Sequence, residues 1–272
     1  MDITDKKLGI TYRYWKGLVF VAAGLLLFAW LLTTPAGLLG KADAIGYAVC
    51  HRIDLRSFHL GERQLPMCAR CSGMYLGAML SLGYQAVIGR RRIGTPPWGV
   101  LLILGLLLIA FAVDGLNSFL SLFPGAPSLY HPNNVLRLLT GTGMGLAIAV
   151  ALYPAFNLSV WRETDARPAL DGVRELGILL ILALLLDAVV LTENPLVLYP
   201  LALVSAVGVI VLLTMVYTML WLMVLKLESR YNRIEQLVLP LIGGFAVGLV
   251  QIGMLDLARY FLTGTWEGFH LG

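Results

Sequence analysis

The most reactive side chains in this sequence of 272 residues are concentrated between residues 50 and 71. All three cysteines of the chain lie there, in the pattern C-H-x16-C-x2-C, and a histidine directly follows the first cysteine. A Cys-x-x-Cys turn lets two sulfurs approach one ion, and a more distant cysteine or histidine can complete a tetrahedral site. We therefore predict a metal site, with zinc as the expected ion and iron as an alternative. The predicted ligands are Cys50, His51, Cys68 and Cys71.

The same segment has other interpretations. Neighbouring side chains such as those of Cys50 and His51 tend to diverge, so His59 or a water molecule is an alternative fourth ligand. A water ligand is typical of catalytic zinc sites, whereas four protein ligands are typical of structural zinc sites. The Cys-x-x-Cys spacing is also that of thiol–disulfide exchange, and Arg70 between the two sulfurs favours the thiolate. A plain disulfide without any metal is the third alternative, but three cysteines cannot pair completely within one chain.

A second group of polar residues lies inside or at the edge of apolar stretches. A charged side chain in a membrane span costs about 2.5–3.5 kcal/mol, so each one needs a partner or a function. Asp114 and Arg137 have no opposite charge at helical spacing. An Asp114–Arg137 ion pair between neighbouring helices, either a brace or the floor of a polar pocket, explains both, and we predict them as catalytic candidates. The substrate-binding candidates are Arg70, Asn117, Asn133 and Asn134.

Some polar residues near these stretches also have a purely structural interpretation. Asn134 is expected to be a helix N-cap, because its side-chain oxygen can accept a hydrogen bond from a first-turn N–H. Asp256 and Arg259 are three residues apart and can neutralise each other on one helix face.

The overall composition defines the class of protein. Hydrophobic residues make up 58% of the chain, charged residues only 13%, and the mean hydropathy is +0.81. A soluble domain has about twice this share of charged residues. These values exclude a soluble enzyme, a disordered tail and a nucleic-acid-binding module. The pI near 9.0 does not indicate nucleic acid, because the basic residues flank hydrophobic stretches.

Long apolar runs predict an all-α, polytopic transmembrane helix bundle that forms a single domain over residues 1–272. A spanning helix needs roughly 20 apolar residues. About seven stretches meet this need, and a long outer loop over 35–72 separates the first two. The predicted spans are 17–34, 73–89, 97–121, 135–155, 174–192, 197–225 and 237–262.

The distribution of lysine and arginine predicts an N-in, C-out orientation. Most basic residues fall in the segments that this orientation places inside, including Arg90, Arg91 and Arg92, whereas the short outer connections 122–134 and 193–196 have none. The first apolar stretch could instead be a signal peptide cleaved near residues 42–44, but its length favours an uncleaved helix. In both cases the cysteine segment and the polar residues lie at the outer face.

Glycines at helical spacing predict close helix packing. Gly73 and Gly77 are four residues apart, as are Gly244 and Gly248, and small residues at this spacing let helices approach each other. The run Gly141-Thr142-Gly143-Met144-Gly145 does not follow a strand, so a phosphate loop is not expected.

Two blocks of residues resemble a prokaryotic membrane family known as domain of unknown function 2085. The resemblance covers about residues 45–150 and implies a multi-pass protein of the prokaryotic plasma (inner) membrane, but no activity. The first block contains Cys50-His51, Arg56-Ser57-Phe58, Gly61, Pro66, Cys68, Arg70-Cys71, Gly73, Tyr75 and Gly77. The second contains Asp114, Pro132-Asn133-Asn134, Arg137 and Thr140-Gly141.

Three functions are compatible with these observations. The first is metal-dependent chemistry at the outer membrane surface on a lipid or small anionic substrate, with Asp114 as a base or an orienting group. The second is a transporter in which zinc only clasps the outer loop. The third is a thiol–disulfide redox protein, which would pass electrons to quinone. The lipid bilayer is the expected partner in all three, and whether the protein is an enzyme stays open at this point.

Overall fold

The computed structural model describes residues 3–123, 125 and 127–266, with side chains from residue 16 onward. Within these residues the chain forms eight α-helices. Seven of them coincide with the predicted spans, and α2 is an additional short helix in the predicted outer loop. The helices are α1 (Ile3–Thr33), α2 (Leu38–Val49), α3 (Ala69–Ile88), α4 (Trp98–Leu120), α5 (Asn134–Val160), α6 (Val173–Leu191), α7 (Pro195–Val224) and α8 (Val238–Thr263).

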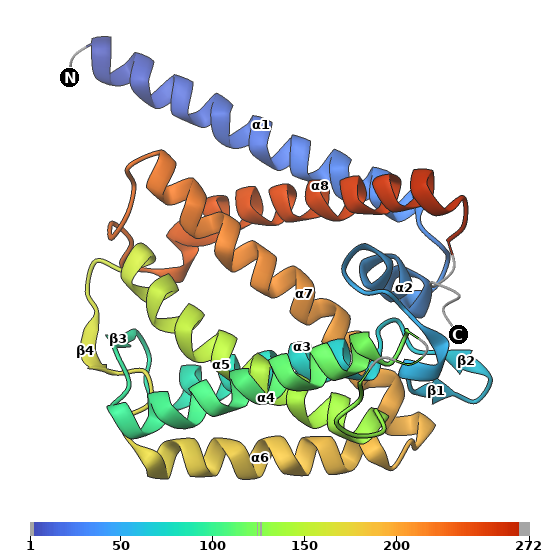
Figure 1. Cartoon of the computed structure of the whole chain (residues 1–272). Coiled ribbons are helices and arrows are strands. Elements are labelled where there is room, and N and C mark those ends of the chain that lie inside the picture. Colours follow the sequence, from blue (N-terminus) through green and yellow to red (C-terminus); the bar gives the residue numbers. More distant parts are fainter. Residues whose placement is uncertain (1–2, 124, 126, 267–272) are drawn as a thin grey trace.

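Short strands and 3₁₀ helices lie in the connections between the helices. The first pair of strands, β1 (His59–Leu60) and β2 (Arg63–Gln64), is an antiparallel hairpin. The second pair, β3 (Arg92–Gly94) and β4 (Asp165–Pro168), is parallel. The 3₁₀ helices are η1 (Asp54–Arg56) and η2 (Ile234–Leu237). Figure 1 shows α2, β1 and β2 at one end of the bundle and β3 and β4 at the opposite end.

Five of the described helices are long and apolar enough to cross a membrane. They comprise residues 16–33 of α1, the helices α4, α5 and α7, and residues 234–263 around α8. Of the other two long helices, α6 carries Arg174, Glu175 and Asp187 within its 19 residues. The remaining helix, α3, packs against α5, α6 and α7, and a helix covered by its neighbours needs less apolar surface than one that faces lipid. The structure confirms a predominantly helical chain suited to a membrane, and the number of seven spans stays a prediction.

Consecutive long helices run in alternating directions between the two ends of the bundle (Figure 1). This arrangement is the one that successive membrane crossings require. It places the start of α3, the end of α4, the start of α5 and the end of α8 at the end that carries α2 and the β1–β2 hairpin. These chain segments contain the polar residues predicted to lie together.

Glycines allow the backbones of α3 and α5 to approach each other closely, as predicted. A Cβ atom on Gly145 would collide with the backbone carbonyl of Met74, and one on Gly141 would collide with the carbonyl of Arg70. From the other side, a Cβ atom on Gly73 would collide with the carbonyl of Leu138. Side chains larger than hydrogen are therefore excluded along this contact, which fixes the start of α3 beside the start of α5.

The first helix lies at the edge of the bundle. Figure 1 shows α1 beside α8 and away from the remaining helices. Lys41 of α2 connects to the end of α1, because its ammonium group donates hydrogen bonds to the carbonyl and hydroxyl of Thr34 at 2.9 and 2.8 Å. Most described side chains of α1 are exposed, as expected for a helix that faces lipid.

Candidate metal centre and arginine cluster

The three cysteines form one cluster at the end of the bundle that carries α2 and the β1–β2 hairpin. The sulfur atoms of Cys50, Cys68 and Cys71 all lie within 4.8 Å of one another. The backbone of Cys50 is extended, so the chain leaves α2 at this residue. Cys68 is the N-cap of α3, and Cys71 lies in the first turn of that helix. Two helix ends therefore present the sulfurs to one another.

A close contact between α2 and the segment before α3 brings Cys50 to the other two cysteines. A Cβ atom on Gly46 would collide with the backbone carbonyl of Pro66, so only glycine allows this approach. The next residue, Met67, is completely buried. Gly46 was not among the residues singled out from the sequence, because its role depends on a partner 20 positions away.

Backbone N–H groups hold the sulfur of Cys50. The amides of Arg52 and Cys68 donate to Cys50 Sγ at 3.4 and 3.3 Å, and the side chain is buried. Hydrogen bonds of this kind favour the charged form of a thiol. They also fix the position of the sulfur before any ligand binds.

The three thiols differ in acidity. The hydrogen bond with Cys50, followed by that with Cys71, holds the pKa of Cys68 well below its usual value. The same hydrogen bond with Cys68 raises the pKa of Cys50 to about 12. Hydrogen bonds with Cys50 and Cys68 raise the pKa of Cys71. Cys68 therefore has the most acidic thiol of the three, and a cation that binds there would have to displace the remaining protons of the cluster.

Neither candidate histidine belongs to the sulfur cluster. Cys50 is buried but His51 is exposed, so these neighbouring side chains diverge, and the cluster of metal-ligating atoms contains the three cysteines without His51. His59 lies in β1, and its Nε2 atom is 2.9 Å from Asp54 Oδ1. Among the described residues, the group of side chains that could hold one metal ion therefore consists of the three cysteines.

The donor set fits zinc. Zn–S bonds of about 2.3 Å in a tetrahedral site place the sulfurs roughly 3.8 Å apart. The three sulfurs are already within 4.8 Å of one another, so small side-chain rotations would complete the geometry. Three soft thiolate ligands favour zinc over the hard cations that prefer oxygen.

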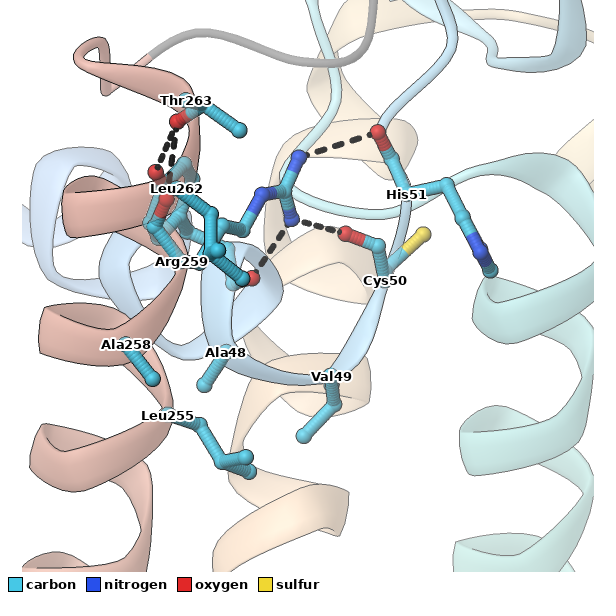
Figure 2. Close-up of a pocket in the computed structure, with 10 residues that line it drawn as sticks. Ala48, Val49, Cys50, His51, Leu255, Ala258, Arg259, Leu262 and Thr263 are labelled. Atoms are coloured by element: carbon cyan, nitrogen blue, oxygen red, sulfur yellow. Dashed lines mark hydrogen bonds between the residues drawn. The ribbon is translucent and has the colours of Figure 1, made fainter.

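The last helix also contacts the cysteine segment. Figure 2 shows Arg259 of α8 reaching the end of α2, where its guanidinium donates to the carbonyls of Tyr47, Cys50 and His51 at 2.6, 2.5 and 3.1 Å. The guanidinium also lies 4.0 Å from the ring centre of Tyr47. Beside it is a pocket of ≈ 450 Å³ lined mainly by apolar side chains of α2 and α8. Arg259 therefore fixes the backbone at Cys50.

The ion-pair partner of Asp114 is Arg70, not Arg137 as expected from the sequence. Asp114 lies in α4 with 1% of its surface exposed. Arg70 Nε donates to its Oδ2 at 3.1 Å, and Arg70 Nη2 forms an ion pair with the same oxygen. Tyr130 and Thr140 donate to the carboxylate at 2.8 and 3.3 Å. Because its oxygens are shared among these donors, Asp114 orients Arg70 and has little capacity left to act as a base.

Tyr130 remains a donor in this network. Burial, together with the hydrogen bond to Asp114, raises the pKa of Tyr130 to about 12. The phenol is therefore protonated at neutral pH and can donate its hydrogen bond to Asp114 Oδ1.

The asparagines have different roles from one another. Asn133 is the N-cap of α5 and accepts from the Leu136 amide at 2.8 Å, so the N-cap expected at Asn134 lies one residue earlier. Asn134 instead accepts from Arg137 Nη1 at 2.8 Å. Asn117 donates to the Tyr130 carbonyl at 3.0 Å and accepts from the Leu129 amide at 2.8 Å, which braces the loop after α4.

A third arginine joins Arg70 and Arg137. Arg56 in η1 donates to the Ser118 carbonyl at 2.9 Å, and Arg70 donates to the Ser118 hydroxyl at the same distance. Arg56 was not among the predicted site residues. The available signal was its place in the first block of family residues, between the cysteines.

Residues 50–151 match the family described as Predicted membrane protein (DUF2085). An uncharacterized protein of Methanothermobacter thermautotrophicus is 34% identical over 102 residues, which are 38% of this chain and 82% of that protein. The chain belongs to this family. An uncharacterized protein of Methanocaldococcus jannaschii is 27% identical over 120 residues, 44% of this chain and 71% of that protein.

The family region contains both clusters. The three cysteines, Arg56, Arg70, Asp114 and Arg137 all lie within residues 50–151. In contrast, α1, α6, α7, α8 and Arg259 lie outside it. No solved structure shows a significant match to the chain.

Proposed function

We propose that this family member is a multi-pass protein of the prokaryotic plasma membrane that binds zinc through Cys50, Cys68 and Cys71 at the outer membrane surface. The observation that supports the proposal most strongly is the convergence of the three sulfurs within 4.8 Å from two separate helix ends. We further propose that the site performs metal-dependent chemistry on a lipid or small anionic substrate.

The protein residues have separate roles in this proposal. Bound zinc with an open fourth position would supply a Lewis acid and lower the pKa of a bound water. Arg70 and Arg137 hold the anionic group of the substrate, and Asn134 orients Arg137 through its hydrogen bond of 2.8 Å. Asp114 is a positioning residue, because it holds Arg70 through Nε and Nη2.

Metal quantification of the purified full-length protein tests the proposal. We expect about one zinc per chain in the wild type and a small fraction of that in Cys68→Ser/Cys71→Ser, because one remaining thiolate cannot retain the ion. His51→Ala is the matched variant, since His51 lies next to Cys50 but outside the sulfur cluster, and it should retain the metal. A wild-type protein with less than about one zinc or iron per two chains would contradict the proposal.

A redox function is the second candidate. It is favoured by the position of Cys68 at the N-cap of α3, one turn before Cys71, and by its lowered pKa, because a thiolate at a helix start is the reactive form in thiol–disulfide exchange. This function predicts that the alkylation of Cys68 and Cys71 changes with the external redox potential. The zinc proposal instead predicts that both are protected from alkylation until a chelator is added.

A further inference from the structure

Three arginines from three different elements converge beside the cysteine cluster. Arg56 in η1 and Arg70 in α3 both donate to Ser118, the first to its carbonyl and the second to its hydroxyl. Arg137 in α5 bonds to Asn134, whose amide nitrogen lies 3.4 Å from the carbonyls of Leu55 and Ser57, on either side of Arg56. Through these two bridging residues the three guanidinium groups share one region.

The positive charge of this region exceeds the negative charge that the described residues provide. Asp114 is the acidic residue in contact with the cluster, and it is paired with Arg70. The hydrogen bonds of Arg56 and Arg137 go to uncharged oxygens, and neither forms an ion pair with a described carboxylate. Burial, followed by repulsion from Arg70, lowers the pKa of Arg56. Three guanidinium groups and one carboxylate leave an excess of two positive charges, which the nearby sulfur of Cys68 offsets only in part.

Arg137 has a buried hydrogen-bond donor that the described residues leave unsatisfied. Its side chain is 6% exposed, and its Nε atom is buried without a hydrogen-bond acceptor among the described residues. A buried donor without an acceptor is unfavourable, and a buried charge without a partner is more so. Arg56 and Arg70 also repel the charge of Arg137, which makes its burial still less favourable. An anion bound between the three arginines would accept a hydrogen bond from Arg137 Nε and would also offset the excess positive charge.

We propose that Arg56, Arg70 and Arg137 form a binding site for a phosphate group. Guanidinium groups bind phosphate oxygens in pairs of parallel hydrogen bonds, and a phosphomonoester carries about 1.5–2 negative charges near neutral pH, which offsets the remaining positive charge. The proposal deepens the proposed function by naming its substrate class, although phosphate binding itself does not require zinc. The phosphate group comes either from solution or from a lipid headgroup.

The arginine site lies near the cysteine cluster. Cys68 and Asp114 both attract the charges of Arg56 and Arg137. Arg70 is positioned by Asp114 and lies between Cys68 and Cys71 in the first turn of α3. A phosphate held by the three arginines would therefore lie beside the fourth position of the zinc site.

Equilibrium dialysis of the purified full-length protein against radioactive inorganic phosphate tests the proposal in a neutral detergent and a phosphate-free buffer. We expect saturable binding that chloride at equal ionic strength does not abolish. Arg56→Gln and Arg137→Gln should each weaken phosphate binding about tenfold or more, because each removes a guanidinium group that can donate two parallel hydrogen bonds. Arg137→Lys keeps the positive charge but cannot donate two parallel hydrogen bonds, so its phosphate affinity should lie between those of the wild type and Arg137→Gln. The control is Arg63→Gln, since Arg63 is on the same side, half exposed and bonded to Asp43.

A lipid arm separates the two sources of phosphate. The same protein is placed in nanodiscs of phosphatidylcholine with or without phosphatidic acid, whose headgroup is a phosphomonoester. Loss of wild-type phosphate binding in nanodiscs that contain phosphatidic acid, with binding retained in those of phosphatidylcholine alone, identifies a lipid headgroup. Undiminished phosphate binding identifies free phosphate. Both outcomes support a phosphate site.

Two outcomes would overturn the proposal. One is a folded wild-type protein that binds neither phosphate nor phosphatidic acid saturably, in which case the arginines only neutralise the cysteine thiolates. The other is unchanged binding in Arg56→Gln and Arg137→Gln. Size-exclusion profiles and zinc content are measured for every variant. An arginine variant that loses phosphate binding but retains zinc supports the phosphate site. A wild-type protein that binds phosphate but contains no zinc also supports the phosphate site, and it contradicts the zinc proposal.

Discussion

Asp114 is the single residue on which the polar cluster depends most. Its carboxylate has 1% of its surface exposed and accepts hydrogen bonds from Arg70, Tyr130 and Thr140. Each of these donors comes from a different part of the chain: α3, the loop after α4, and α5. Because removing one partner of a buried ion pair leaves the other charge uncompensated, the loss typically costs about 3–5 kcal/mol.

We therefore expect Asp114→Asn and Arg70→Gln each to lower thermal stability strongly. The double variant Arg70→Gln/Asp114→Asn should lose less than the sum of the two, because no uncompensated charge remains. Thermal unfolding of the purified variants in detergent measures this difference. Asp54→Asn is the control, since Asp54 is exposed and contacts His59 at the surface. Strictly additive losses would show that the two side chains do not pair.

At the scale of elements, the contact between α3 and α5 sets the geometry of both clusters. These two helices carry Cys71, Arg70 and Arg137, and glycines on both sides keep their backbones close. A shift between the helices would separate Arg70 from Arg137 and change the start of α3, where two of the sulfurs lie.

Gly145→Ala tests this contact. Its Cβ atom would collide with the Met74 carbonyl, so the helices must move apart, and we expect a loss of about 1–3 kcal/mol together with weaker zinc retention. The matched control is Gly105→Ala in α4, where a Cβ atom would meet nothing within 4 Å and alanine is the better helix former. Equal stability of the two variants in thermal unfolding would show that α3 and α5 are not in close contact.

A second contact between elements joins α8 to the end of α2 through Arg259. We expect Arg259→Ala to weaken zinc affinity by about 10–100-fold, because the backbone at Cys50 loses three hydrogen bonds that position it. Competition with a chromophoric chelator measures the affinity. Arg162→Ala at the opposite end of the bundle should leave it unchanged. If Arg259→Ala binds zinc as tightly as the wild type, α8 does not support the site.

At the scale of the whole molecule, both clusters lie at the end of the bundle opposite to the β3–β4 pair (Figure 1). The connections at the β3–β4 end contain Arg90, Arg91, Arg92, Arg162 and Arg167. Positive residues of this kind remain in the cytoplasm during insertion. The proposed orientation therefore exposes the zinc and phosphate sites to the outer membrane surface.

Fusions of a reporter enzyme that is active only outside the cytoplasm test this orientation. A fusion after residue 228, between α7 and α8, should be inactive, and a fusion at the C-terminus should be active, because α8 then carries the reporter across the membrane. A green fluorescent protein at the same two points should give the opposite pattern. Activity at position 228 would reverse the orientation and place both clusters in the cytoplasm.

The sequence by itself determined the class of the protein and the positions of its long helices. Long apolar runs are a local property, so they identify a helical membrane protein and most helix limits to within about five residues. The exception is α1, which begins at Ile3, before the predicted apolar span 17–34. The pair Cys68 and Cys71 was equally predictable, since a spacing of three residues at a helix start places both sulfurs on adjacent positions of one turn. The additional helix α2 was not, because it is short and lies in a loop without a sustained apolar pattern.

The tertiary structure decided which distant residues meet. Cys50 joins the other cysteines only because Gly46 lets α2 approach Pro66. Likewise, Asp114 pairs with Arg70 and not Arg137, because the path of the chain and the close contact of α3 with α5 set which guanidinium reaches α4. Spacing along one helix specifies neighbours within that helix, whereas contacts between helices depend on rotations and distances that a single side-chain pattern does not encode. The sulfur cluster and the three-arginine cluster are therefore products of helix packing.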